Sequence, residues 1–391
     1  MFSPSFIRAI QVALLLPTTI VFASPVASNA SVVQTRAAGG LADAAKAAGL
    51  RFFGASTTVD QLNDEPYAEL LSNTSDFNLV TSLEQFVWGS IERQPGQYDF
   101  SVADRLIAFA ERNGQLVAGG TLVDAVRHYR APGYINPLPN KYPPDDIRVA
   151  LEKFVTAVVS RYRGRVRKCL ILQFQARGRC AHLTLKITGM SPEPKDVTFG
   201  RFFSVEWGVG VTDYLQIALR AARKADPNVK LYVSNAYLEE FTGRNVTDFP
   251  AMLNLVKRLQ AENVPIDGVN FWLDLFALPS IPPEGDFYSN LVSKFRQLEE
   301  LGVEGTLGST SIWTEEDRPW NPPAAPLHAQ VYRDVVRACK DSKACVGINL
   351  ASLTDKYQIL IDAGPINPYP WDKDLQKKEH IYNAIRDGLV G

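Results

Sequence analysis

Short apolar runs alternate with amphipathic segments along most of the chain. Eight runs have the length and β-branched or aromatic content of buried strands, namely residues 50–56, 78–86, 115–123, 167–174, 229–235, 268–275, 303–310 and 345–353. Between them, apolar residues recur at the spacing of one helix face in residues 101–113, 147–162, 213–225, 250–262, 287–301 and 327–339. Regular alternation of this kind predicts parallel strands joined by crossover helices.

The number of strand and helix units favours a closed barrel over an open sheet. Eight units within about 350 residues fit a (β/α)₈ TIM barrel, which takes about 250 residues plus insertions. We therefore predict an α/β fold with a single barrel domain over residues 41–391. Residues 1–23 are predicted to be a signal peptide and residues 24–40 an N-terminal segment.

The N-terminus carries the features of a secretory signal. Arg8 precedes an apolar run over residues 10–16, and small residues lie where a signal peptidase would cut after Ala23. Pro17 interrupts the run, which is shorter than the roughly 20 residues of a membrane span. We expect a secreted, extracellular and soluble protein without a membrane partner. Three glycosylation sequons are compatible with secretion, and they begin at Asn29, Asn73 and Asn245.

Charge and histidine spacing exclude several classes of function. The chain has 41 Lys and Arg against 42 Asp and Glu, which leaves no basic surplus to bind a nucleic acid. Its four histidines lack paired ligand spacing, so we expect them at surface or capping positions and predict no metal and no cofactor; they are His128, His182, His328 and His380. We also expect the protein to be a monomer.

Four cysteines fit an oxidising compartment. Cys339 and Cys345 flank a short turn between a helical run and an apolar strand, and no histidine nearby would complete a metal site. We predict that they form a disulfide. Whether Cys169 pairs with Cys180 stays open at this point.

Several segments in sequence order resemble the xylanases of glycoside hydrolase family ten. They include the opening Leu-Ala-Asp-Ala-Ala-Lys-Ala-Ala-Gly, the Pro-Gly-Gln-Tyr-Asp-Phe turn and the Ala-Asp-Pro-Asn-Val-Lys-Leu-Tyr strand; the segments lie at residues 41–49, 53–57, 80–88, 95–100, 119–123, 222–232, 264–269 and 338–348. The resemblance implies a (β/α)₈ barrel and an endo-1,4-beta-xylanase activity. It further implies retention of anomeric configuration by two carboxylates about 5.5 Å apart.

The residues at the implied catalytic positions cannot perform this chemistry. The family's acid/base glutamate ends a Trp-Asp-Val-Val-Asn-Glu motif on the fourth strand, where this chain has Phe174, and a phenyl ring transfers no proton. The nucleophile's position on the seventh strand falls on Ser309, which has no histidine nearby in sequence to serve as its base. An alternative alignment makes Glu315 the nucleophile but requires an insertion of about six residues in an element with short connections.

The carboxyl ends of barrel strands form the active sites of this fold, so polar residues there are candidates for ligand binding. These candidates are Glu84, Asp124, Tyr237, Trp272 and Asp274. If Asp124 and Asp274 converge, one carboxyl would have a raised pKa and could act as an acid or base. Compared with the residues that the resemblance implies, the replacements Leu83, Val87, Trp272 and Phe174 would make the cleft more apolar.

Three hypotheses follow. The first is a secreted pseudo-glycosidase that binds a small-molecule or polysaccharide ligand, or a protein partner, without hydrolysis. The second is an active xylanase-type hydrolase that uses Glu315 with an acid supplied by Asp124 or Asp274. The third is a non-hydrolytic enzyme, such as a cyclase that orders a small apolar metabolite. Residues 168–196 match no family loop, and one interpretation is a translated intron or a frame-shifted segment, which would make Phe174, Cys169 and Cys180 non-native.

Overall fold

The computed structural model describes residues 39–124, 132–135, 143–174, 211, 213–236, 249–276, 287–314, 324–357 and 367–391. For residues 124, 144, 169–174, 235–236, 276 and 324 it describes the backbone alone. Residues 39–391 belong to one compact unit. The predicted signal peptide and N-terminal segment up to residue 38 lie outside the described residues, as do Tyr237, Glu315, Cys180, Asn29, Asn245, His128 and His182.

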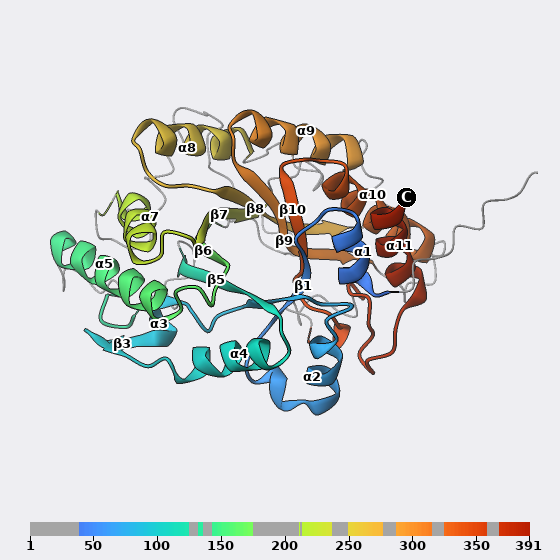
Figure 1. The fold of residues 1–391 in the computed structure, drawn as a ribbon, viewed down its shortest axis with the longest axis horizontal. Helices are drawn as coiled ribbons and strands as arrows, with labels where there is room; N and C mark the ends of the chain where they lie inside the picture. The colour runs from blue at the N-terminus through green and yellow to red at the C-terminus, as the bar shows by residue number, and fades with distance from the viewer. Residues whose placement is uncertain are drawn as a thin grey trace, which may run out of the picture. The chain divides into compact units, whose positions relative to one another are not determined.

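Eight parallel strands close into a barrel (Figure 1), which confirms the predicted fold class. Their order around the barrel is β1 (Phe52–Thr57), β10 (Cys345–Leu350), β9 (Glu304–Trp313), β8 (Gly268–Phe276), β7 (Lys230–Ala236), β6 (Lys168–Phe174), β5 (Leu116–Asp124) and β2 (Leu79–Ser82), which pairs again with β1. Each corresponds to one of the predicted strands. Only a closed ring leaves no strand edge unpaired, so the barrel satisfies the backbone groups of all eight.

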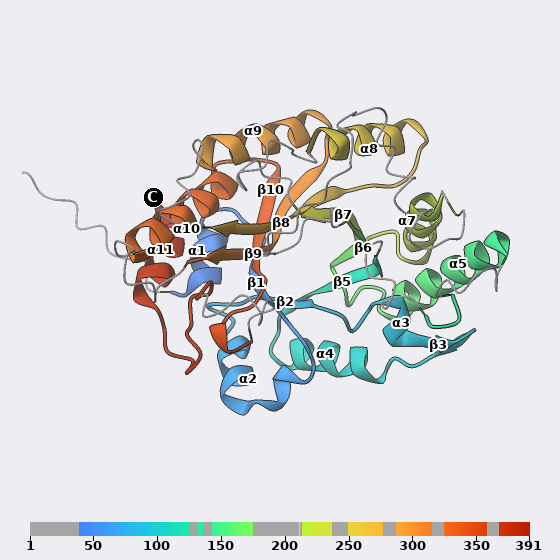
Figure 2. The same ribbon diagram turned by 180° about the vertical axis from the view of Figure 1, so that it is seen from behind.

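Helices surround the strands on the outside of the barrel (Figures 1 and 2). They are α1 (Leu41–Ala47), α2 (Glu65–Ser72), α4 (Ser101–Arg112), α5 (Pro144–Arg161), α7 (Tyr214–Ala225), α8 (Phe249–Ala261), α9 (Phe287–Glu300), α10 (Ala324–Lys340) and α11 (Glu379–Val390). In α4 the buried residues Ala103, Leu106, Ile107 and Ala110 follow the spacing of one helix face. The six helices expected from periodicity are present, whereas α2 and α11 were not predicted.

Short elements occupy the connections. They are η1 (Gln61–Asn63), α3 (Trp88–Ile91), the antiparallel pair β3 (Glu92–Gln94) and β4 (Gln97–Tyr98), and η3 (Asp355–Tyr357). Glu92 is buried in the α3–β3 corner, where it accepts hydrogen bonds from Trp88 Nε1 at 2.6 Å and from the backbone N–H of Gly96 at 2.6 Å. These bonds satisfy a carboxylate that burial would otherwise penalise.

Three predicted strand ends were wrong. The strand predicted for residues 78–86 ends at Ser82, because Ser82 Oγ donates to Gln85 Oε1 at 2.8 Å and accepts from Gln85 N at 3.0 Å, which turns the chain. The last strand ends at Leu350 instead of residue 353. In contrast, β9 continues past residue 310 to Trp313, which pairs with Phe276 of β8.

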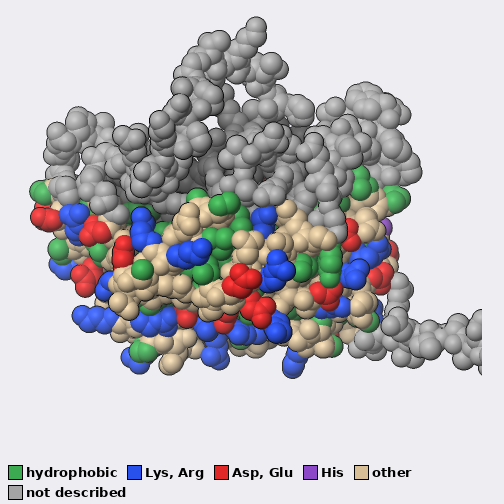
Figure 3. All heavy atoms as spheres, turned by 90° about the horizontal axis from the view of Figure 1, so that it is seen from above, with side chains coloured by type: hydrophobic (Ala, Val, Ile, Leu, Met, Phe, Trp, Pro, Cys, Tyr) green, Lys and Arg blue, Asp and Glu red, His purple; other side chains and the backbone are tan. Residues whose placement is uncertain are grey.

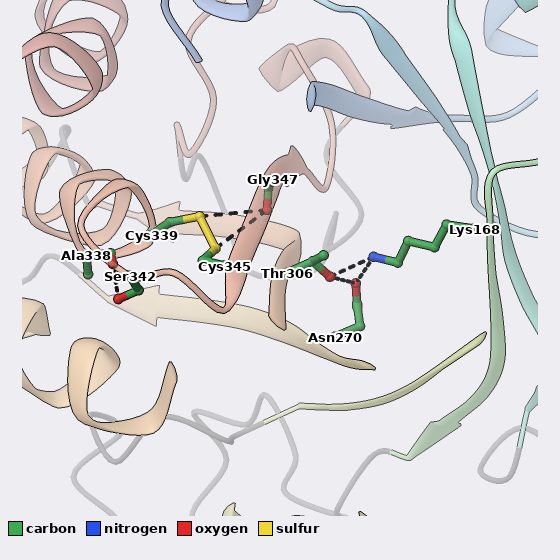
Figure 4. Close-up of a disulfide and its surroundings, with 8 residues drawn as sticks. All are labelled: Lys168, Asn270, Thr306, Ala338, Cys339, Ser342, Cys345 and Gly347. Carbon is green, nitrogen blue, oxygen red and sulfur yellow. Dashed lines mark hydrogen bonds between the residues drawn. A yellow bond between two sulfur atoms is a disulfide. The ribbon is translucent and has the colours of Figure 1, made fainter. Parts of the chain in front are cut away.

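Polar side chains fill part of the barrel interior. Lys168 Nζ donates to Asn270 Oδ1 at 2.7 Å and to Thr306 Oγ1 at 2.6 Å (Figure 4), and Asn270 Nδ2 donates to Ser234 Oγ at 2.9 Å. These four residues, on β6, β8, β9 and β7, are all buried. Barrel interiors are usually dominated by branched apolar residues, so a polar layer requires mutual hydrogen bonds of this kind.

A second polar cluster is centred on Asn349 of β10. Its Nδ2 donates to Ser56 Oγ at 2.9 Å and to the Gly308 carbonyl at 3.1 Å, and its Oδ1 accepts from Thr81 Oγ1 at 2.8 Å. Gly308 is required here for a steric reason, because a Cβ at this position would lie 1.6 Å from Asn270 Oδ1. Gly308 therefore lies between the two polar clusters, where there is no room for a side chain.

The predicted disulfide between Cys339 and Cys345 is present and joins the end of α10 to the start of β10, with the two Cα atoms 5.1 Å apart (Figure 4). The expectation of a surface or capping position was wrong for His328, which is fully buried. Its Nε2 donates to the Ile312 carbonyl at 2.7 Å, and burial lowers its pKa to about 3. It is therefore a neutral core residue.

Candidate functional site

The candidate site lies at the carboxyl ends of the strands, which meet at one end of the barrel because all eight are parallel. Asp124 and Phe174 are the last residues of β5 and β6. Glu84 follows the end of β2 and is exposed to solvent. The side chains of Asp124 and Phe174 lie outside the described residues, as does Tyr237.

Side-chain alternation along β8 directs Trp272 and Asp274 toward the barrel interior. Phe271 faces the outer helices, since its ring lies 5.9 Å from that of Phe249 and 5.1 Å from that of Phe295. Asn270 faces the interior, where it bonds Lys168. Because successive side chains of a strand point to opposite faces, Trp272 and Asp274 follow Asn270 on the interior side and nearer the open end. Both are partly exposed.

Asp274 lies beside β9, where Ser311 is its register partner. Burial raises the pKa of the Asp274 carboxyl to about 6, against the opposite effect of the polar groups of Trp272, Trp313 and Ser311 around it. The hydroxyls of Ser311 and Tyr369 lie 3.1 Å apart, and both residues are buried. Trp272, Trp313 and Ser311, the described groups that act on this carboxyl, are all neutral.

The only carboxylate of β9 lies at the opposite end of the strand. Glu304 begins β9, where its Oε1 is 2.9 Å from Arg51 Nη1 and 3.0 Å from Lys230 Nζ, and its Oε2 accepts from Tyr232. Burial alone would raise the pKa of Glu304, but the bonds from Tyr232, Lys230 and Arg51 together lower it. Glu304 is thus a structural anion at the closed end of the barrel.

Toward the open end, β9 presents hydroxyl groups and no carboxylate. Ser309, at the predicted nucleophile position, pairs with Trp272 in register and is partly exposed. Thr310 and Ser311 follow it and are buried. The sequence of β6, Lys-Cys-Leu-Ile-Leu-Gln-Phe, contains no acid either. In the described part of the chain, these two strands therefore supply no pair of carboxylates.

Asp124 and Asp274 are not on neighbouring strands. β6 and β7 stand between β5 and β8 in the order of the barrel, and Asp124 pairs in register with Gln173 of β6. Since the Asp124 side chain lies outside the described residues, convergence of the two carboxyls stays a prediction.

Glu315 lies outside the described residues, but β9, the strand that precedes it, is longer than predicted. The strand continues to Trp313 and only Thr314 separates it from residue 315. The sequence predicts that this strand ends three residues earlier, at residue 310. In the sequence, residue 315 therefore follows the end of β9 after a single residue, and its role as nucleophile stays a prediction.

Sequence reasoning missed Ser311, Trp313 and Tyr369. The period-two alternation from Ser309 through Ser311 to Trp313 was a signal for the first two. No local pattern marks Tyr369, which reaches Ser311 from 58 residues farther along the chain.

Within the described ranges, no three His, Cys, Asp or Glu side chains gather as metal ligands. Of the helices in these ranges, none has the length and apolar character needed to cross a bilayer. On the face seen in Figure 3, acidic and basic side chains are intermixed, which agrees with the balanced charge of the sequence.

Comparison with known sequences identifies the family. The family model described as Glycosyl hydrolase family 10 matches residues 40–172 and 192–388. The match is interrupted over the segment that resembles no family loop, and Phe174 lies in this interruption, so its assignment to the acid/base position stays a prediction. An endo-1,4-beta-xylanase of Agaricus bisporus is 31% identical over 343 residues, which cover 87% of this chain and 92% of that protein. Endo-1,4-beta-xylanase C of Phanerodontia chrysosporium is 29% identical over 348 residues, covering 88% and 78%.

Solved structures show the same fold. Xylanase 10B of Thermotoga maritima superposes with a TM-score of 0.71 at 21% identity, covering 90% of this chain and 98% of that one. The Penicillium canescens endo-1,4-beta-xylanase XylE gives a TM-score of 0.73 at 16% identity, covering 90% and 98%. The family match, the relatives and the barrel agree, and this chain belongs to glycosyl hydrolase family 10.

Proposed function

We propose that this chain is a secreted, monomeric family 10 barrel that binds a sugar or another small molecule at the open end without cleaving xylan by double displacement. One observation carries the proposal: the described open-end residues of β9 are Ser309, Thr310 and Ser311, while the strand's only acid, Glu304, is bound to Arg51 and Lys230 at the other end. Secretion rests on the predicted signal at residues 1–23.

The chemical reason is that retaining hydrolysis needs two carboxyl groups on either side of the glycosidic bond. One protonates the leaving oxygen and the other attacks the anomeric carbon. A serine can replace the second only when a base takes its proton. Ser311, the next interior position on β9, lies against the hydroxyl of Tyr369, whose pKa burial raises, and a neutral phenol is no base.

Relatives support a carbohydrate-sized ligand. The relatives compared above are named endo-1,4-beta-xylanases, and xylanase 10B of Thermotoga petrophila was solved in complex with xylobiose. Since this barrel has the same fold, its open end is the place where we propose a ligand of similar size to bind. Trp272 and Asp274, which are partly exposed on the interior side of β8, would be contact residues.

The test is to incubate the purified protein with xylan and to analyse the soluble reducing sugars by chromatography. We expect no xylo-oligomers above a buffer control at enzyme concentrations that let an ordinary xylanase digest the substrate completely. Release at an ordinary xylanase rate would refute the proposal.

A second candidate is a hydrolase that uses Glu315 as nucleophile and Asp274 as acid. It is favoured by the pKa of about 6 at Asp274, which suits a general acid in mildly acidic medium. In that case Glu315→Gln and Asp274→Asn would each abolish any xylan hydrolysis seen in the wild type. Hydrolysis that survives both substitutions would exclude this candidate.

A further inference from the structure

The connection from α2 to β2 holds α1 and α11 together. Asp76 is buried there, and its Oδ1 accepts from the Leu41 N–H of α1 at 3.0 Å and from the Tyr382 hydroxyl of α11 at 2.6 Å. The Ser75 carbonyl accepts from the Ala42 N–H at 2.9 Å. The turn thus satisfies amides at the beginning of α1 that have no partner within the helix, and α1 packs beside α11 (Figures 1 and 2).

The side-chain amide of Asn73 completes this turn at the protein surface. Its Oδ1 accepts from the Ser75 N–H at 3.2 Å, and its Nδ2 donates to Asp76 Oδ2 at 3.0 Å. Asn73 and Thr74 are both exposed, although Asp76 beside them is buried. Asn73, Thr74 and Ser75 form a glycosylation sequon, so the nitrogen that a glycan would modify lies on the surface in a turn of fixed geometry.

The turn lies at the end of the barrel opposite the candidate site. It precedes β2, which begins at Leu79, and therefore lies at the amino ends of the parallel strands. A glycan is bulky and hydrophilic and belongs on a surface. Attached at Asn73, it would leave the open end accessible to a ligand.

We propose that Asn73 carries an N-linked glycan and that the modified nitrogen keeps its hydrogen bond to Asp76. In the transfer, Nδ2 bonds to the anomeric carbon of an oligosaccharide carried on a lipid pyrophosphate. The bond from that carbon to the pyrophosphate oxygen breaks, Nδ2 loses one proton and the lipid pyrophosphate leaves. One hydrogen remains on Nδ2, and it is donated to Asp76 Oδ2. The modification requires the proposed secretion but not the proposed binding at the open end.

The two ways of removing a glycan should affect this turn differently. An endoglycosidase that leaves the first sugar on Nδ2 preserves the remaining N–H. An amidase that cleaves the glycan from Asn73 leaves an aspartate instead, where the amide nitrogen was 3.0 Å from Asp76 Oδ2. The bond is then lost and two carboxylates repel one another, so the amidase product should melt about 2 °C below the endoglycosidase product.

The experiment is to express the full chain in a eukaryotic host that secretes it and to map the peptides by mass spectrometry after amidase treatment in isotopically labelled water. We expect labelled aspartate at position 73 in most molecules. Unmodified Asn73 would overturn the proposal, including a result in which only Asn245 is modified. Xylan hydrolysis by a protein modified at Asn73 would instead count against the proposed function alone, so the two failures are distinguishable.

Two neighbouring hydroxyls provide a matched pair of variants. Ser75→Ala destroys the sequon but keeps the backbone bonds of Ser75, and it should abolish the modification. Thr74→Ala keeps the sequon and should leave the modification unchanged. A sugar lost in Thr74→Ala but kept in Ser75→Ala would be attached to Thr74 oxygen and would overturn the proposal. Equal melting temperatures of the amidase and endoglycosidase products would show that the bond to Asp76 is not kept.

Discussion

Lys168 Nζ lies 2.6 Å from Thr306 Oγ1, so a side chain that starts on β6 reaches β9 through the interior of the barrel (Figure 4). The same ammonium lies 4.4 Å from the centre of the Tyr232 ring. Burial lowers the pKa of Lys168 to about 7 from an ordinary value of 10.5, with a smaller opposite effect from Glu304. The barrel interior thus contains an amine whose pKa is close to neutral pH.

Replacing this amine should stabilise the protein in a pH-dependent way. The folded-state pKa lies below the unfolded value, so the cost of burying the charge is full below about pH 7 and disappears above about pH 10.5. Lys168→Met should raise the melting temperature at pH 6 and have less effect at pH 10. Lys230→Met is the matched control, since Lys230 pairs with Lys168 in register but bonds Glu304, and it should destabilise. A melting temperature for Lys168→Met below that of the wild type at pH 6 would show that the buried charge does not destabilise the protein.

Asp274→Asn should also change stability with pH. Here the folded pKa, about 6, is above the ordinary value of 3.8, so the cost of the ionised form is absent below about pH 4 and full above about pH 6. The variant should melt close to the wild type at pH 4 and at a higher temperature at pH 8. The test compares the melting temperatures of the variant and the wild type from pH 4 to pH 8. A difference in melting temperature that stays constant over this range would show that burial does not set the pKa of Asp274.

Glu304→Gln should destabilise the closed end of the barrel. The substitution leaves Arg51 and Lys230 without their carboxylate, at an expected cost of about 1–3 kcal/mol in urea unfolding at pH 7. The pKa of Glu304 is lowered, so its contribution is present above its ordinary value of 4.5 and is lost as pH falls below it. Glu300→Gln, in an exposed pair with Arg296, should change little. An equal loss of stability in the two variants would refute the assignment of Glu304 as a structural anion.

Removal of the Cys339–Cys345 disulfide should have a moderate effect. The bond closes a short loop, with a sequence separation of 6, and the chain-entropy relation gives about 2 kcal/mol for a loop of this size. The double variant Cys339→Ala with Cys345→Ala should therefore unfold at lower urea concentration while keeping the same far-ultraviolet spectrum. Reduction of the wild type should reproduce the shift.

Gly308→Ala should be severely destabilising. The new Cβ would lie 1.6 Å from Asn270 Oδ1, so Asn270 would have to move and lose its bonds to Lys168 and Ser234. We expect a loss above about 3 kcal/mol, as for other substitutions that break a buried network. Gly133→Ala is the control, because no atom lies within 4 Å of its added Cβ. A soluble, equally stable Gly308→Ala protein would show that the packing around Asn270 adapts.

The sequence determined the architecture because strand and helix periodicities are local. Each of the eight strands and six of the helices was visible as a run of apolar positions, and the spacing of Cys339 and Cys345 was enough to predict the disulfide. Strand ends were less predictable, since β9 continues to Trp313 through pairing with β8, a partner whose register no local pattern reveals. The burial of His328 was also unpredictable from local pattern, because it depends on contact with Ile312 of β9.

The chemistry of the interior was decided by tertiary structure. Sequence identified Asp274 as a candidate, but its neutral surroundings come from Trp313 and Ser311 on another strand and from Tyr369, 58 residues beyond Ser311. Lys168 gave no sign in sequence that it crosses the barrel. Periodicity specifies which face of an element is buried, whereas closure of the barrel decides which side chains meet, and those meetings determine the desolvation and charge balance that set each pKa.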